Sequence, residues 1–287
     1  MAVYEKTYRR YEGRLTPRKS RFLVLARYAK AEVFSARITT ALFALSFAVP
    51  LGAAVLVYLH HNAGALQLMD LRPQDVLPID EQFFFVLTSI QGFFAFLLTV
   101  LVAPGLVSPD LAHNALPLYL ARPFSRTEYV AGKMTVLLVL LSLVTWVPLL
   151  LLFFLQVELE GASWTADYGH VGWAIFAGSA IWVLVLSLLG LAFSAWAKWR
   201  TAAAGLLFAV FFVGQALSAV VNEMFDTRWG SILHLGELIQ TVWSGLFYLQ
   251  TTPGLLPVPA AWGALALLCG FCLLLLNRRL KAYEVVR

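Results

Sequence analysis

Apolar residues occur along the chain in long runs that carry no charged side chain. Six runs of about 20 residues lack Asp, Glu, Lys, Arg and His, and each is long enough to cross a bilayer as a helix. They are Ile38 to Leu59, Phe83 to Val107, Met134 to Val157, Val171 to Ala197, Thr201 to Val221 and Val258 to Leu276. The pattern predicts an all-α integral membrane protein with six transmembrane helices.

Composition supports this prediction, because 60% of the 287 residues are hydrophobic and only 13% are charged. A soluble fold cannot bury so many apolar side chains in one core. We expect one membrane domain over residues 38–276, an N-terminal segment over 1–37 and a C-terminal tail over 277–287. No short apolar core with a cleavage site follows the basic N-terminus, so a cleaved signal peptide is not expected.

Basic residues predict the orientation of the spans. Alternate segments outside the spans carry 10, 3, 2 and 4 of the 21 Lys and Arg residues, and the other three segments carry two in total. The positive-inside rule therefore places both termini in the cytoplasm, in a multi-pass protein of the cytoplasmic (inner) membrane. This distribution accounts for the net charge of +5 without a nucleic-acid partner.

Two segments outside the spans carry apolar patterns of their own. The stretch from Ser20 to Arg37 sets apolar residues on one helical face and predicts an amphipathic elbow helix on the inner leaflet; a solvated cytoplasmic helix is the alternative. The segment Asn222 to Pro257 contains a fairly apolar stretch, Ser231 to Leu249, which is interrupted by His234, Glu237 and Gly245. A seventh span here would put the basic C-terminus outside, so we expect a re-entrant or interfacial helical hairpin.

The spans contain no Asp, Glu, Lys, Arg or His, which disfavours an ion-coupled transporter or proton pump. Gln91, Gln156 and Gln215 are expected to form hydrogen bonds between helices, although they alternatively line a polar stretch of a translocation path. Small residues at helical spacing, such as Gly190 and Ser194, allow close helix packing.

Candidate metal and catalytic groups are sparse. The weak candidates for metal ligands are His60, His61, Met69 and the pair His234 and Glu237, and interfacial side chains are the simpler interpretation of the histidines. Cys269 and Cys272 lie within a predicted span and are interpreted as structural. The sequence has no G-x-S-x-G, no H-E-x-x-H and no P-loop, so we expect no catalytic, metal or cofactor site on this chain.

The segment between the second and third spans, Ser108 to Lys133, is patterned more strongly than a tether. Leu111, Ala115 and Leu118 share one face of a short predicted helix that ends at Arg122-Pro123. Ser125 with Glu128 predicts a capping box that starts a second helix, which continues through Lys133 into the third span. A short helix of this kind on the cytoplasmic side is a docking surface for a partner, or else part of a hairpin on the inner leaflet.

This segment resembles the corresponding loop of type-2 ABC exporter (ABC-2) permeases. The family pattern has an acidic residue, a Gly-Thr-Leu step, a basic-Pro-x-Ser-Arg run and a Gly-Lys pair, which Asp110, Arg122 to Arg126 and Gly132-Lys133 match. The chain departs from it at Asn114-Ala115-Leu116, where Asn tolerates the left-handed backbone that Gly supplies. Within the family the pattern is most similar to permeases of the copper-enzyme-maturation and gliding-motility type.

The resemblance implies a permease subunit of an ATP-binding cassette transporter, which pairs with a second copy or a similar permease and binds two separate ATPase subunits. ATP and Mg would then bind to the partner ATPase. The resemblance further implies a coupling helix over Ser108 to Leu120, with contacts to the ATPase from Asp110, Asn114, Leu116, Leu118, Arg122, Pro123, Ser125 and Arg126. Candidate residues for the lining of an apolar path are Phe85, Gln91 and Phe94, with Phe93 and Phe96 nearby.

Two other functions stay open at this point. A membrane-embedded, lipid-handling enzyme or assembly scaffold would use the 222–257 hairpin as its site and would work without an ATPase. An ion-coupled secondary transporter would need an ion site built from backbone and hydroxyl groups, and its transport would survive ATP depletion.

Overall fold

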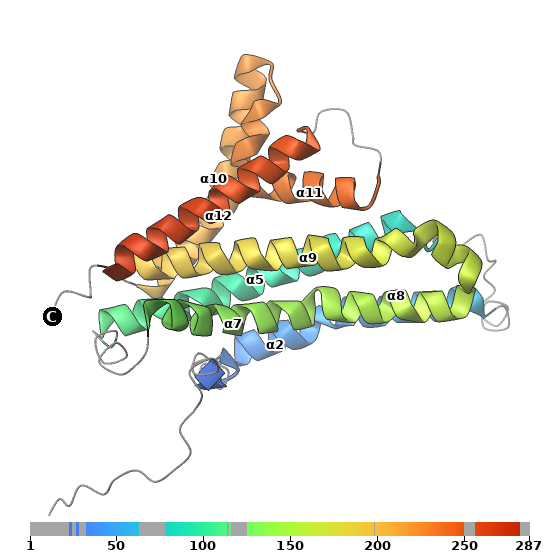
Figure 1. The fold of residues 1–287 in the computed structure, drawn as a ribbon, viewed down its shortest axis with the longest axis horizontal. Coiled ribbons are helices and arrows are strands. Elements are labelled where there is room, and N and C mark those ends of the chain that lie inside the picture. Colours follow the sequence, from blue (N-terminus) through green and yellow to red (C-terminus); the bar gives the residue numbers. More distant parts are fainter. Residues whose placement is uncertain are drawn as a thin grey trace, which may run out of the picture.

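The computed structural model describes residues 23–24, 27–28, 33–62, 78–113, 115, 125–197, 199–249 and 256–281, and the regular structure of these residues is helical throughout (Figure 1). Its helices in chain order are α2 (Arg37–Ser46), α3 (Ala48–His61), α5 (Glu81–Ala112), α7 (Arg126–Val144), α8 (Trp146–Glu160), α9 (Ala162–Trp196), α10 (Arg200–Phe225), the 3₁₀ helix η3 (Trp229–Leu233), α11 (Leu235–Leu246) and α12 (Val258–Lys281).

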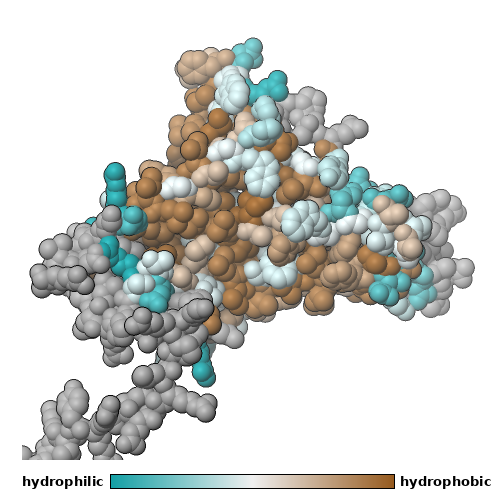
Figure 2. All heavy atoms as spheres, in the orientation of Figure 1, coloured by the Kyte–Doolittle hydropathy of each residue, from teal (hydrophilic) through white to brown (hydrophobic). Residues whose placement is uncertain are grey.

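Six helical stretches are long and apolar enough to cross a membrane, which confirms the predicted all-α class and the six spans. They are Arg37–His61, Glu81–Ala112, Arg126–Glu160, Ala162–Trp196, Arg200–Phe225 and Val258–Arg279. Hydrophobic residues cover most of the face shown in Figure 2, and hydrophilic residues gather toward the two ends of the long axis and where α10 ends. The chain is a multi-pass helical membrane protein.

Helices α5 and α9 form the centre of the molecule, with α7 and α8 packed alongside (Figure 1). In α9, 72% of the most apolar stretch is buried, against 11% in α10, which diverges from the central helices. Close packing of α5 on α9 depends on Gly190, where an added Cβ would lie 2.5 Å from Cβ of Ala103. The small-residue spacing predicted at Gly190 and Ser194 therefore lies in the central helix contact.

The third and fourth spans are joined by a single residue. Gly161 has φ of +90°, a conformation that L side chains rarely adopt, and it separates α8 from α9. Both helices thus extend beyond the predicted span ends at Val157 and Val171. The hydroxyl of Thr165 donates to the Gly161 carbonyl (3.0 Å) and closes the turn.

The first and third spans are each divided in the middle, which the sequence analysis did not predict. The breaks lie at Phe47 and Thr145, and a proline follows each break three residues later, at Pro50 and Pro148. Proline removes the N–H that would bind the carbonyl four residues earlier. Both breaks border one apolar cavity of about 330 Å³ between α2–α3 and α7–α8.

The segment before the last span contains the 3₁₀ helix η3 and one short helix, α11. Asp226 ends α10 in a left-handed conformation (φ 45°), and Asn222 accepts from the Gly230 N–H (2.8 Å) and donates to Ser231 (3.1 Å), which turns the chain into η3. Helix α11 follows with 12 residues, about 18 Å of helix, which is too short to be a seventh span. It packs against α9, α10 and α12, as Figure 1 shows.

Part of the predicted elbow helix, 20–37, lies outside the described residues. Residues 23–24 and 27–28 are helical, and the chain turns at 34–36 before α2. The Phe34 ring packs edge-on against Phe43 at 5.3 Å, which fixes the entry into α2.

Candidate functional site

A buried polar cluster joins the end of α5 to the beginning of α7. The Asp110 carboxylate on α5 lies 2.9 Å from Lys133 Nζ and accepts a hydrogen bond from the Tyr129 hydroxyl (2.7 Å), both on α7. Tyr129 is fully buried, and Lys133 is 8% exposed. A charge removed from water needs a partner of opposite sign, so these three side chains depend on one another.

The sequence sets the register of this cluster. Tyr129 and Lys133 are four residues apart, so they lie on one face of α7 and reach the same carboxylate. Helix α7 begins at the predicted capping box, in which the Ser125 N–H donates to Glu128 (2.6 Å) and the Glu128 N–H donates to the Ser125 hydroxyl (3.2 Å). The prediction of a capping box at Ser125 is confirmed.

Backbone contacts hold the end of α5 as well. The Ala115 N–H donates to the Asp110 carbonyl (2.8 Å), and the His113 N–H donates to the Pro109 carbonyl (3.0 Å). A carboxylate near a helix C-terminus is disfavoured by the helix dipole. Lys133 therefore compensates both the burial and the position of Asp110.

Ser194 of α9 inserts its hydroxyl into α5. The hydroxyl accepts from the N–H groups of Val107 (3.1 Å) and Ser108 (3.0 Å) and donates to the Pro104 carbonyl (3.2 Å). Ser108 in turn donates to the carbonyl of Ala197 (3.0 Å), so α5 and the end of α9 are connected in both directions.

The predicted coupling residues divide into two groups. Asp110, Ser125 and Arg126 lie at the junction of α5 and α7, where Arg126 is half-buried in the first turn of α7. Asn114, Leu116, Leu118, Arg122 and Pro123 lie outside the described residues. Within the stretch predicted as a separate coupling helix, residues 108–112 continue α5 without a break. The hydrogen bond of Ser108 to the Ala197 carbonyl and the ion pair of Asp110 with Lys133 hold these last residues of α5 in place.

The predicted path residues lie in different surroundings. Gln91 is fully buried, and its amide donates to the Ser46 carbonyl (2.9 Å), which has no helical donor because residue 50 is proline. Phe85 packs on Phe247 with ring centres 5.9 Å apart, and Phe94 is half-buried against the core. The interhelical hydrogen bond predicted for Gln91 is present.

Of the candidate metal ligands, Met69 lies outside the described residues, and Nδ1 of His60 is buried without a hydrogen-bond partner among the described residues. His61 binds Glu160 (2.6 Å) and the Val57 carbonyl (2.9 Å), and His234 Nδ1 lies 3.8 Å from Glu237. Within the described residues, which exclude Met69, no three His, Cys, Asp or Glu side chains are grouped closely enough to hold a metal ion. Cys269 and Cys272 are both free thiols on α12.

Comparison with known proteins adds nothing to these observations, because the chain matches no family model and no curated protein. The class of the protein therefore rests on its six apolar helices. The contacts at the junction of α5, α7 and α9 are the structural basis for a proposed function.

Proposed function

We propose that this chain is the permease subunit of a type-2 ABC exporter, moved by ATPase subunits that bind the link between α5 and α7. The observation that supports the proposal is the ion pair of Asp110 and Lys133, because both residues belong to the family pattern and they lie on opposite sides of the link. Tyr129, 19 positions after Asp110, donates to the same carboxylate. A chance match of the sequence to the family pattern would not require these residues to contact one another in the structure.

The junction is built to transmit a displacement. Asp110 ties the end of α5 to α7 through Tyr129 and Lys133, and Ser194 with Ser108 ties the same turn of α5 to α9. A partner that moves the link would move three spans as one body. ATP binding can shift the permease between two states only if the ATPase contacts the link differently in each of them.

The remaining parts of the proposal follow from charge and motif. The distribution of basic residues favours a cytoplasmic location for the link and both termini, on the side of the membrane where ATP is available. The chain has no P-loop, so ATP and Mg belong to the partner subunits, and a second permease copy or a similar permease completes the complex.

The test is co-purification. The chain is tagged at its C-terminus, extracted gently from its native membrane and analysed by mass spectrometry. We expect a soluble ATPase with a P-loop in an amount equal to the permease. The variants Arg122→Glu and Arg126→Glu should lose this partner, whereas Arg228→Glu, a reversal of the same charge after α10, should keep it. Absence of any ATPase in several mild detergents contradicts the proposal.

A further inference from the structure

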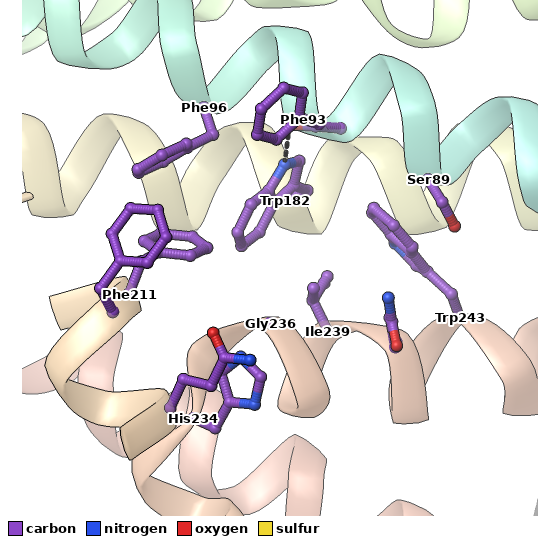
Figure 3. Close-up of a pocket in the computed structure, with 13 residues that line it drawn as sticks. Ser89, Phe93, Phe96, Trp182, Phe211, His234, Gly236, Ile239 and Trp243 are labelled. Atoms are coloured by element: carbon purple, nitrogen blue, oxygen red, sulfur yellow. Dashed lines mark hydrogen bonds between the residues drawn. The ribbon is translucent and has the colours of Figure 1, made fainter. Parts of the chain in front are cut away.

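A cavity of about 200 Å³ lies between α5, α9, α10 and α11 (Figure 3). Its wall is mainly aromatic, with side chains from all four helices: Phe93, Phe96, Trp182, Phe211, Phe212 and Trp243. Phe96 and Phe211 pack with ring centres 4.0 Å apart, and Trp182 meets Phe211 edge to face at 5.7 Å. None of the three predicted path residues lines it, although Phe93 and Phe96 do.

The two tryptophans are fixed in place by backbone groups. Trp182 Nε1 donates to the Gly92 carbonyl (2.9 Å), and Trp243 Nε1 donates to the Gly178 carbonyl (3.0 Å). Both glycines leave room for indole, because an added Cβ would lie 2.6 Å and 2.8 Å from the Trp243 ring. With their N–H groups used inside the protein, the indoles offer the cavity rigid apolar surface.

The polar groups of the cavity are uncharged amides and a hydroxyl. Gln215 of α10 and Gln240 of α11 line it; both side chains are exposed, and neither amide forms a hydrogen bond with another described residue. The Ser89 hydroxyl donates to the Phe85 carbonyl (2.9 Å), which leaves it free to accept. The one titratable group among the lining residues is His234, and it lies 3.8 Å from the Glu237 carboxylate.

The residues that line the cavity favour an uncharged ligand. No Lys, Arg, Asp or Glu lines the cavity, so an ionised group bound there would be desolvated without a counter-charge. Aromatic rings and two free amides instead match a molecule with an apolar body and an uncharged polar end. Phe93 and Phe212, 57% and 59% exposed, place the mouth on the apolar surface of α5 and α10, which faces hydrocarbon in a bilayer.

We propose that this cavity binds a neutral amphiphile that enters from the bilayer. The apolar body lies against Trp182, Trp243 and the phenylalanines, and a hydroxyl, carbonyl or amide at the polar end binds Gln215 and Gln240. The site goes beyond the proposed transport function, because binding here does not require an ATPase. A failure of one proposal therefore leaves the other standing.

The experiment uses the full chain reconstituted in phosphatidylcholine vesicles. A photoactivatable, clickable dioleoylglycerol is the neutral probe, and a phosphatidylglycerol with the same chains is the anionic probe. After irradiation, adducts are located by peptide mass spectrometry. We expect the neutral probe to label the peptides that line the cavity, unlabelled dioleoylglycerol to compete, and the anionic probe to label only exposed faces of the spans.

Matched variants separate the cavity from the surrounding lipid. Ser89→Phe fills the cavity and should abolish this labelling, whereas Ile90→Phe adds the same ring to the neighbouring, lipid-exposed position and should not. Gln215→Leu and Gln240→Leu keep the volume and should each reduce labelling about fivefold, the effect of one lost hydrogen bond. Equal labelling by both probes, or labelling unchanged in Ser89→Phe and in both glutamine variants, would overturn the proposal.

Discussion

The Asp110 carboxylate and the Lys133 ammonium group lie 2.9 Å apart, one near the end of α5 and the other in the second turn of α7. Their side chains are 17% and 10% exposed, so the pair is largely removed from water. The two helices are joined by the link that the sequence predicts to contact an ATPase. The ion pair, together with the Tyr129 hydroxyl that donates to the same carboxylate, therefore connects α5 and α7 across the base of that link.

Removal of one charge should destabilise the protein more than removal of both. Asp110→Asn or Lys133→Met leaves the other charge largely buried without an opposite charge, at a cost of about 3 kcal/mol in the free energy of unfolding. The double variant should recover most of this loss. Unfolding in detergent by added denaturant, followed by tryptophan fluorescence, measures the coupling; additive single effects would mean that the pair does not interact.

Tyr129→Phe removes one hydrogen bond to a carboxylate and keeps the ring. Because the hydroxyl donates to Asp110 at 2.7 Å, we expect a loss of about 2 kcal/mol in the free energy of unfolding. In an Asp110→Asn background the same substitution should cost less than half as much. An equal cost in both backgrounds would assign the effect to packing and not to the carboxylate.

Ser194→Ala should weaken the contact of α9 with α5, because the hydroxyl serves two N–H groups and one carbonyl of α5. We expect a loss of about 2 kcal/mol. Ser187→Ala is the matched control on the same helix, since its buried hydroxyl has no partner within the described residues. That control should be neutral or slightly stabilising, and two equal losses would show that Ser194 acts only through its volume.

Gly190→Ala should force α5 and α9 apart, at a cost of about 2 kcal/mol, because the new Cβ would lie 2.5 Å from Cβ of Ala103. Adding Ala103→Gly should restore part of the stability. Gly205→Ala on α10 is the control, because open space surrounds that position. Thermal unfolding of these three variants and the unchanged protein in one detergent compares their stability, and a Gly190→Ala protein as stable as the Gly205→Ala control would contradict the packing.

Local signals in the sequence predicted most of the architecture. Charge-free runs define the six spans, and the Ser125 capping box depends on residues only three positions apart. The contacts of the candidate site could not be predicted from the sequence. Gln91 contacts Ser46, and Ser194 contacts Ser108, only after helices that are distant along the chain pack together. Pro50 and Pro148 did carry a signal for the mid-span breaks, but a hydropathy run does not register the loss of one N–H.

The two proline breaks have a mechanical consequence for the bundle. Both breaks lie beside the same cavity, so the first span is divided into α2 and α3 next to the place where the third span is divided into α7 and α8. A helix bends most readily where a backbone hydrogen bond is missing. The halves nearest the link can thus change their tilt while α3 and α8 keep theirs, and the shared cavity supplies the volume into which side chains shift. Motion that starts at the α5–α7 link would then be taken up at mid-membrane as a bend shared by two spans.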